Sequence, residues 1–376
     1  MINRLLQKRI FSSLQPGKVV VLLGARRIGK TYLLKQIMKQ ITEPFIYLNG
    51  EEISTVDLLE RRTIKNYENL LEGKKLLIID EAQKVPAIGN ILKLMVDGIE
   101  GLKVIATGSS AFDLANNSGE PLTGRKITLK LYPLSEKELY DIEPFPAKKD
   151  NLHKRLIYGS YPEVYTINSN DEKKSYLEDL INSYLLRDIL AFENVKNSSK
   201  IINLLRLVAF QIGGEVSQYE IAKNLQLSRN TVEKYLDLLT KVFILFKLEG
   251  FSRNLRKEIV KSSKWYFYDN GIRNALIANL NPLTIRNDTG ALWENYMISE
   301  RIKFQSYNKM LVNNYFWRTY DRQEIDLIEE REGNLFAFEM KWNETKTKIP
   351  AAWDKAYPDS QFKVITQENY TNWLIK

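Results

Sequence analysis

The sequence has no cysteine and a single histidine, His153. The lack of cysteine excludes disulfides, thiolate zinc sites, iron–sulfur clusters and cysteine nucleophiles. A histidine-rich metal site is excluded too, and a catalytic triad would depend on His153 alone. The ordinary alternative is a partly buried structural histidine. Any chemistry therefore uses carboxylates, lysine, arginine, hydroxyl groups and hard metal ions such as Mg²⁺.

Long apolar runs are missing as well, because none approaches the roughly 18 residues needed to span a bilayer. The N-terminal stretch MINRLLQKRIFSSLQPG has no apolar segment followed by a small-residue cleavage site, so it does not resemble a signal peptide. We therefore expect a cytoplasmic protein that does not enter a membrane. The 376 residues, 44% of them apolar and 27% charged, predict an ordinary globular protein of two or three domains.

The net charge is +9 and the isoelectric point is near 9.2. This balance fits a polyanionic partner, either a nucleic acid or phosphate ligands. A well-solvated, lysine-rich surface would give the same balance without any such partner.

Short apolar runs alternate with helical patterns in the first third of the chain. Strands are expected at residues 18–23, 45–48, 76–79, 104–106 and 127–131. Strands that alternate with helices predict an α/β fold with a parallel sheet covered by helices on both faces.

The segment GARRIGKT, residues 24–31, matches the phosphate-binding loop G-x-x-x-x-G-K-[ST] without departure. Glycines let the backbone N–H groups wrap around phosphate oxygens, and the start of the following helix adds its positive dipole end. Lys30 would reach the β- and γ-phosphates, and the Thr31 hydroxyl would bind Mg²⁺. The alternative is a glycine-rich turn without nucleotide. The predicted nucleotide-binding residues are Gly24, Ala25, Arg26, Arg27, Ile28, Gly29, Lys30 and Thr31.

The run LLIIDE has the pattern of a Walker B strand. Asp80 would hold Mg²⁺ through water, and Glu81 would polarise the water that attacks the γ-phosphate. The alternative is a strand that ends in two solvated carboxylates.

Two further segments supply candidate catalytic side chains. The strand-like run before Ser109 would place a hydroxyl beside the γ-phosphate, with Thr107 and Ser110 as alternatives; a turn capped by serine is the structural reading. Arg125 would stabilise transition-state charge, in cis or from a neighbouring subunit of a homo-oligomer. A structural ion pair explains Arg125 equally well.

Taken together, GARRIGKT, LLIIDEAQ, ATGSS, LTGR and LYPLSEKEL resemble the prokaryotic AAA-like ATPases that carry a C-terminal domain of unknown function. The later stretches GSYPEV, KWYFYDNGIRNAL and GALWENYMISE extend the resemblance over almost the whole chain. The family more often has proline at position 25 and valine at position 28, where neither side chain contacts phosphate. The resemblance implies ATP rather than GTP, and an additional strand between the P-loop and Walker B strands.

Residues 217–240 have the pattern of a helix-turn-helix. Ser228 caps the second helix, which leaves Arg229 and Asn230 exposed near its start, where they suit base edges or phosphates. The apolar runs 242–248 and 265–268 would pair as the hairpin of a winged helix.

The segment between those two runs is basic. It contains Arg253, Arg256, Lys257, Lys261 and Lys264 against Glu258 alone. Such a wing would suit the backbone of duplex DNA. The alternative is a winged helix that acts as a lid or a protein-binding module.

Near the C-terminus, EIDLI and LFAFEMK look like the D…E-x-K core of the restriction-endonuclease-like fold. Period-two spacing places Glu339 and Lys341 on one strand face. Asp326 and Glu339 would bind Mg²⁺, Lys341 would orient the attacking water, and Glu294 would add a further carboxylate. Such domains can also keep this fold without cleaving DNA.

The sequence thus predicts an additional-strand, AAA-like P-loop NTPase core at residues 1–142, a helical lid at 143–196, a winged helix at 198–270, and a restriction-endonuclease-like α/β domain at 271–376. The expected function is Mg²⁺-dependent ATP hydrolysis coupled to DNA binding. The alternative is a nucleotide-gated protein-interaction switch with an inactive nuclease-like domain.

Overall fold

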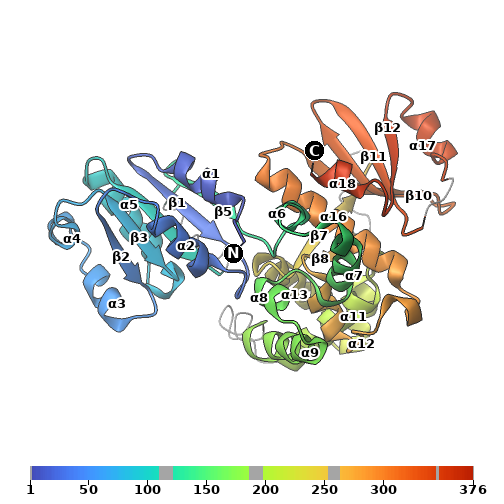
Figure 1. Ribbon diagram of the computed structural model, residues 1–376, viewed down its shortest axis with the longest axis horizontal. Coiled ribbons are helices and arrows are strands. Elements are labelled where there is room, and N and C mark those ends of the chain that lie inside the picture. The colour runs from blue at the N-terminus through green and yellow to red at the C-terminus, as the bar shows by residue number, and fades with distance from the viewer. Residues whose placement is uncertain (1, 110–121, 186–197, 253–262, 344–346, 376) are drawn as a thin grey trace. The chain divides into compact units, whose positions relative to one another are not determined.

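The computed structural model describes residues 2–109, 122–185, 198–252, 263–343 and 347–375 (Figure 1). The chain divides into two compact units: Met1–Tyr132 with Lys241–Phe243, and Pro133–Thr240 with Ile244–Lys376. The first compact unit ends ten residues before the predicted boundary at residue 142. Within the described segments, no helix combines the length and the apolar character needed to cross a membrane.

The first unit is built on a five-stranded parallel sheet in the order β2-β3-β4-β1-β5 (Figure 1). All five strands lie where the apolar runs predict them. β4 lies between β1 and β3, as expected for the additional-strand class. Every residue of β3 is buried, which requires cover on both faces. The strands are β1 Lys18–Leu23, β2 Phe45–Asn49, β3 Leu76–Asp80, β4 Lys103–Gly108 and β5 Lys126–Lys130.

Five α-helices accompany this sheet in the described part of the first unit. Their apolar residues recur at helical spacing and are buried, for example Leu33, Leu34 and Ile37 of α2. That spacing makes one stripe of each helix apolar, so the helix packs through it against the strands. The helices are α1 Leu6–Ser13, α2 Lys30–Met38, α3 Ile53–Glu60, α4 Ile64–Leu71 and α5 Ile88–Gly98.

The second unit combines helices with one mixed sheet. Its first helix, α6, begins at a capping box in which Ser135 and Glu138 satisfy each other's backbone N–H groups, a strong start signal. The helices are α6 Glu136–Tyr140, α7 Lys148–Tyr158, α8 Pro162–Thr166, α9 Asn170–Asp179, α11 Ser198–Phe210, α12 Gln218–Leu225, α13 Arg229–Lys241, α15 Asn270–Leu276, α16 Thr289–Tyr307, α17 Ala351–Ala356 and α18 Tyr370–Leu374.

Seven strands form this sheet, in the order β12-β11-β10-β9-β7-β8-β6. β6, β7 and β8 pair antiparallel, as do β9, β10 and β11, whereas β7–β9 and β11–β12 pair parallel. The strands are β6 Glu215–Val216, β7 Leu245–Gly250, β8 Ser263–Phe267, β9 Asn313–Arg318, β10 Glu324–Arg331, β11 Asn334–Met340 and β12 Gln361–Ile365.

The pairing of β7 with β9 joins strands from either side of the predicted boundary between residues 270 and 271. Glu249 and Gly250 lie opposite Tyr315 and Phe316, and the Phe251 N–H donates to the Phe316 carbonyl oxygen at 2.7 Å. The two predicted modules therefore share one hydrogen-bonded sheet.

Residues 143–150, where the predicted helical lid begins, are an ordered part of the second unit. It contains a short 3₁₀ turn, Phe145–Ala147, and the first residues of α7. The Glu143 carboxylate is buried and accepts from Arg155 at 2.7 Å. This buried ion pair holds the start of the second unit against α7.

Candidate functional site

The predicted phosphate-binding loop connects β1 to the first residue of α2, Lys30. Gly29 has a φ of 91°, in the left-handed region that favours glycine. Gly24 has no room for a side chain, because a Cβ atom there would lie 2.3 Å from the Leu131 carbonyl oxygen and 2.4 Å from Cδ1 of Ile28. The backbone itself therefore requires glycine at both of these positions of the motif.

Lys30 is buried, and its ammonium group donates to the carbonyl oxygens of Gly24 and Ala25 at 3.0 Å each. The loop therefore curls around a positive charge at the start of a helix, which is the arrangement that anions favour. Thr31 follows as the second residue of α2 and is half-buried.

The Walker B carboxylate is held by the neighbouring strand. Asp80 ends β3 and is 3% exposed, and the Thr107 hydroxyl of β4 donates to its Oδ1 atom. The Glu81 N–H donates to Thr107 Oγ1 at 3.0 Å and to Asp80 Oδ1 at 3.2 Å. Glu81 itself has a φ of 49°, a strained conformation typical of functional positions.

Gln83 is a site residue that the sequence analysis missed. Its side-chain amide donates to Glu81 Oε2 and, at 3.3 Å, to the Ser109 hydroxyl. Ser109 is therefore linked to Glu81 through Gln83, while Thr107 contacts Asp80 directly. The sequence signal that could have identified Gln83 is its position two residues after Glu81, at the end of the Walker B run. The alternative candidate Ser110 lies outside the described residues.

Arg125 does not reach this loop within the same chain, which corrects one of its two predicted roles. β5 runs parallel to β1 with Val19 opposite Lys126, so Arg125 lies at the start of the strands and the P-loop at their end. Six residues of strand separate the two levels, or roughly 20 Å. Arg125 instead forms an ion pair with Asp97, as the structural alternative expected.

The residues of the first site fit a nucleotide with Mg²⁺. Lys30 and the loop N–H groups supply positive charge and donors for phosphates. Thr31 and Asp80 supply the hard oxygen atoms that Mg²⁺ prefers. The buried Oε1 atom of Gln83 has no hydrogen-bond partner within the described structure, so this region keeps one acceptor free.

A second set of charged residues gathers where α16, β8, β10 and β11 meet. Glu294 accepts from the Tyr266 hydroxyl at 2.6 Å, and Asp326 accepts from the Met340 N–H at 2.8 Å. A bulge in β10 between Ile325 and Ile328 sets the direction of the Asp326 side chain. Glu294 and Glu339 both interact electrostatically with Asp326, so these three carboxylates lie in one cluster.

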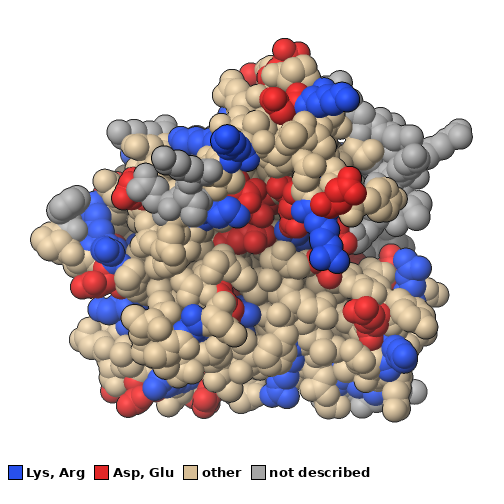
Figure 2. Space-filling model, turned by 90° about the vertical axis from the view of Figure 1, so that its right-hand side faces the viewer, with Lys and Arg blue, Asp and Glu red and all other residues tan. Residues whose placement is uncertain are grey.

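Two lysines neutralise the cluster. Lys341 donates to Glu339 Oε1 at 2.6 Å. Lys264 lies 3.4 Å from Glu294 and forms a shorter ion pair with Glu324, although it is only 1% exposed. Its sequence neighbours suggested that Lys264 belongs to an exposed basic wing, but the buried side chain contradicts this. The face in Figure 2 has a hollow where acidic side chains gather beside basic ones.

Burial dominates the proton affinities in this cluster. Burial, with the charge of Asp326, raises the pKa of Glu294 to about 8 and that of Glu339 to about 7. Burial also raises the pKa of Asp326. For Lys264 burial alone would lower the pKa, but the surrounding carboxylates outweigh it and raise the pKa above its usual range.

These residues do not fit a divalent metal as they stand. No group of three or more acidic, histidine or cysteine side chains in the described segments is placed to hold a metal ion. The Lys264 ammonium group already forms an ion pair with the Glu324 carboxylate, and the raised pKa of Glu294 keeps that side chain mainly protonated at neutral pH. We therefore derive no metal-dependent step for Glu294, Asp326, Glu339 and Lys341.

The predicted DNA-contacting residues fall into two groups. Arg229 and Asn230 are exposed at the start of α13, with Arg229 Nε 3.4 Å from Gln218 Oε1. Ser228 caps this helix by accepting from the Thr231 N–H at 3.1 Å, as predicted. Arg253, Arg256 and Lys257 lie outside the described residues.

A buried ionic network in the second unit was also missed. The Arg155 guanidinium donates to Glu136 at 2.7 and 3.0 Å, to Glu143 at 2.7 Å and to the Tyr296 hydroxyl at 3.0 Å. His153, on the same helix, packs against Trp342 with ring centroids 5.6 Å apart. Arg155 and its partner Tyr296 are 141 positions apart in the chain. Such distant partners leave no local sequence pattern from which the network could have been predicted.

Three stretches of the chain match known protein families. Residues 16–140 match the AAA domain, residues 149–284 the domain of unknown function DUF8612, and residues 289–371 the domain of unknown function DUF4143.

Individual proteins of several organisms are similar over most of the chain. An uncharacterized protein of Mycobacterium tuberculosis is 27% identical over 90% of this chain and 73% of its own length. One of Methanocaldococcus jannaschii is 26% identical over 95% of this chain and 82% of its own length. Among solved structures, the Walker-type ATPase of Pyrococcus abyssi aligns with 73% of this chain and 96% of its own, with a TM-score of 0.48 and 15% identity. The family matches support an AAA-like P-loop domain followed by a C-terminal domain of unknown function.

Proposed function

We propose that the first unit binds ATP and hydrolyses it with Mg²⁺. The observation that carries this proposal is the convergence of three elements: a loop curled around Lys30, the Walker B carboxylate Asp80, and a strand between them whose Thr107 hydroxyl holds that carboxylate. Lys30 and the loop N–H groups bind the phosphates, while Thr31 and Asp80 are placed to hold Mg²⁺. When bound, Mg²⁺ neutralises charge that develops on the phosphate oxygens.

Glu81 is the proposed general base, and its neighbours set its position. The strained backbone of Glu81 is held by two N–H donations to Thr107 and Asp80, and its carboxylate is held by Gln83. Gln83 also binds Ser109, so Ser109 acts through Gln83 on the orientation of the base. A general base typically contributes 10²–10⁴-fold to the rate.

The test is steady-state ATP hydrolysis by purified variants. Lys30→Ala is expected to abolish ATP binding and turnover, whereas Lys35→Ala, an exposed lysine on the same helix, is expected to leave both unchanged. Glu81→Gln is expected to retain ATP binding and to lower kcat by about 10²-fold or more. Normal turnover in Lys30→Ala would refute the site.

We further propose that the second unit couples this ATPase to duplex DNA. The supporting observation is the run α11, β6, α12, α13, β7, β8, with the strands ordered β6-β8-β7. This order is typical of winged helices, and α13 presents exposed Arg229 and Asn230 at its start, where recognition helices contact DNA. The net charge of +9 is of the required sign, and the untested residues Arg253, Arg256 and Lys257 belong to the same proposal.

DNA stimulation of ATP hydrolysis at low salt tests the coupling. The double variant Arg229→Ala, Asn230→Ala is expected to weaken stimulation. It should also reduce the slope of log Kd against log salt concentration by about 1, the value for one lost phosphate contact. Lys363→Ala, an exposed lysine on β12, is the matched control. A wild-type rate that is indifferent to DNA would contradict the coupling and would favour a nucleotide-gated protein-interaction switch.

For the C-terminal carboxylates we propose a nuclease-like fold without cleavage. Lys264 pairs with Glu324 and Lys341 pairs with Glu339, so these lysines balance carboxylate charge that a metal would otherwise balance. Mg²⁺- or Mn²⁺-dependent DNA cleavage by the wild type that disappears in Glu339→Ala would refute this proposal and restore the nuclease prediction.

A further inference from the structure

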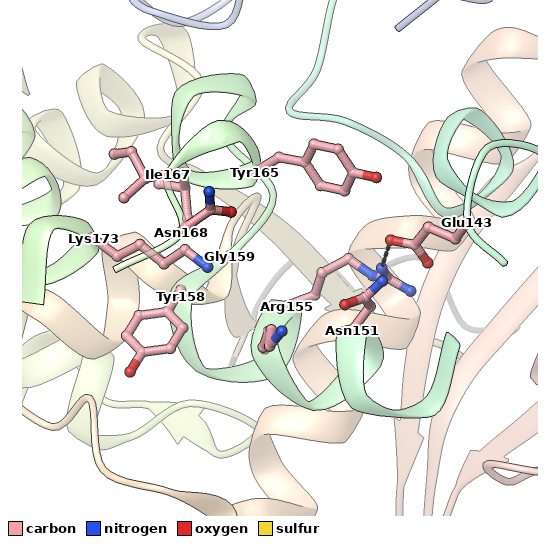
Figure 3. Close-up of a pocket in the computed structure, with 11 residues that line it drawn as sticks. Glu143, Asn151, Arg155, Tyr158, Gly159, Tyr165, Ile167, Asn168 and Lys173 are labelled. Atoms are coloured by element: carbon pink, nitrogen blue, oxygen red, sulfur yellow. Dashed lines mark hydrogen bonds and ion pairs between the residues drawn. The ribbon is translucent and has the colours of Figure 1, made fainter. Parts of the chain in front are cut away.

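A pocket of about 240 Å³ lies between α7, α8 and α9 of the second unit, far in sequence from the P-loop and from the carboxylate cluster (Figure 3). Its volume is below the roughly 300–1,000 Å³ of sites for drug-sized ligands, so it suits a small molecule. The lining residues used below are Glu143, Lys154, Arg155, Tyr158, Asn168 and Lys173.

Lys173 is the unusual member of this lining. It is only 7% exposed, and the described residues offer its ammonium group neither a hydrogen bond nor an ion pair. The Lys173 Nζ atom lies over the Tyr158 ring, 5.5 Å from the ring centroid. Burial and the nearby Lys154 lower the pKa of Lys173. Because a buried charge without a partner is costly, this lysine is poised to gain a negative partner.

The other charged residues that line the pocket do not supply a negative partner for Lys173. Arg155 is fully engaged by Glu136, Glu143 and Tyr296. The lining thus carries three cations against a single carboxylate, Glu143, which is already bound to Arg155. In Figure 3, Lys173 and Asn168 lie at one end of the pocket and Glu143 lies at the other, so an anion beside Lys173 avoids the carboxylate.

We propose that this pocket binds the phosphate group of a small phosphorylated molecule through Lys173, with Lys154 at the same site and the Asn168 amide as a hydrogen-bond donor. Lysine binds phosphate as a point charge, whereas bidentate recognition of a phosphate or a carboxylate requires the fork of arginine. The one arginine in the lining is committed, and both lysines are not. The site is separate from the proposed ATPase site and does not depend on it.

The test uses the full chain in a Lys30→Ala background, so that the P-loop does not contribute. Inorganic phosphate and glycerol phosphate are titrated by calorimetry at constant ionic strength, with succinate as the carboxylate comparison. Lys173→Met is expected to weaken phosphate binding at least tenfold. The matched control is Lys174→Met, since Lys174 is the next residue, is exposed and pairs with Asp171 at 2.9 Å.

Two further readouts keep the result decisive. Lys173→Met removes an uncompensated buried charge, so its Tm without phosphate should equal or exceed that of the parent, and its phosphate-induced rise in Tm should vanish. Hydrogen exchange of the wild type should show phosphate protection at α7–α9. Equal phosphate binding by Lys173→Met, tighter binding of succinate, or protection absent from α7–α9 would each overturn the proposal.

Discussion

The substitution Glu294→Gln tests the carboxylate cluster through the pH dependence of unfolding. The folded protein holds a proton on Glu294 up to about pH 8, whereas the unfolded chain releases it near 4.5. Unfolding between these values therefore releases a proton, so rising pH favours the unfolded state. The contribution of protonated Glu294 to the stability of the second unit is fully present below pH 4.5 and is lost as the pH rises to about 8.

The size of the effect follows from the same pair of values. A rise from 4.5 to about 8 corresponds to at most about 5 kcal/mol. Because the proton is shared within a cluster that includes Asp326 and Lys264, we expect about 2–5 kcal/mol. Glutamine keeps an oxygen that accepts from Tyr266 but cannot ionise, so the variant should be more stable than the wild type at pH 9 by this amount.

Tryptophan fluorescence provides the assay, because all six tryptophans lie between Trp265 and Trp373, in the second unit. Urea unfolding of the wild type and Glu294→Gln is followed from pH 5 to pH 9. Glu332→Gln, at an exposed position, is the control and should parallel the wild type. Parallel profiles for the wild type and Glu294→Gln would refute the reasoning.

Two other substitutions test buried elements of the two units. Gly24→Ala should weaken ATP binding at least tenfold in a binding titration, because its Cβ atom would meet the Leu131 carbonyl oxygen at 2.3 Å. Arg155→Met should cost about 3–5 kcal/mol of unfolding free energy in urea, because Glu136 and Glu143 would stay buried without their cation.

Gly24→Ala and Arg155→Met each have a control substitution of the same type. Gly290→Ala places its Cβ atom where no other atom lies within 4 Å, so it should leave ATP binding and stability unchanged. Lys154→Met removes an exposed cation next to Arg155 on α7 and should change stability by less than about 0.5 kcal/mol. Unchanged ATP binding in Gly24→Ala, or equal losses in Arg155→Met and Lys154→Met, would contradict these explanations.

The sequence predicted the first unit well because its signals are local. The loop from Gly24 to Thr31 joins a strand and a helix that are neighbours in sequence, and an apolar run before Asp80 reads as a strand without knowledge of the rest. The signal for the second helix of the predicted helix-turn-helix is equally local, because the capping residue Ser228 directly precedes the first residue of that helix.

The errors arose where contacts join distant residues. Five basic residues around position 260 suggested an exposed wing, but Lys264 is buried by carboxylates 30 and 60 positions away. Arg125 follows a plausible motif, yet the parallel register of β5 places it at the wrong edge of the sheet. The pairing of β7 with β9 across the predicted boundary at residue 270 could not be foreseen, because it has no local signal.

That pairing has a practical and an evolutionary consequence. A fragment cut at residue 270 would expose the edge of β9, which invites aggregation, so the last hundred residues should express poorly alone. The same hydrogen bonds mean that the helices α12 and α13 cannot be exchanged for another pair of helices without repairing the sheet. Homologous recombination between relatives should therefore transfer the second unit as a whole.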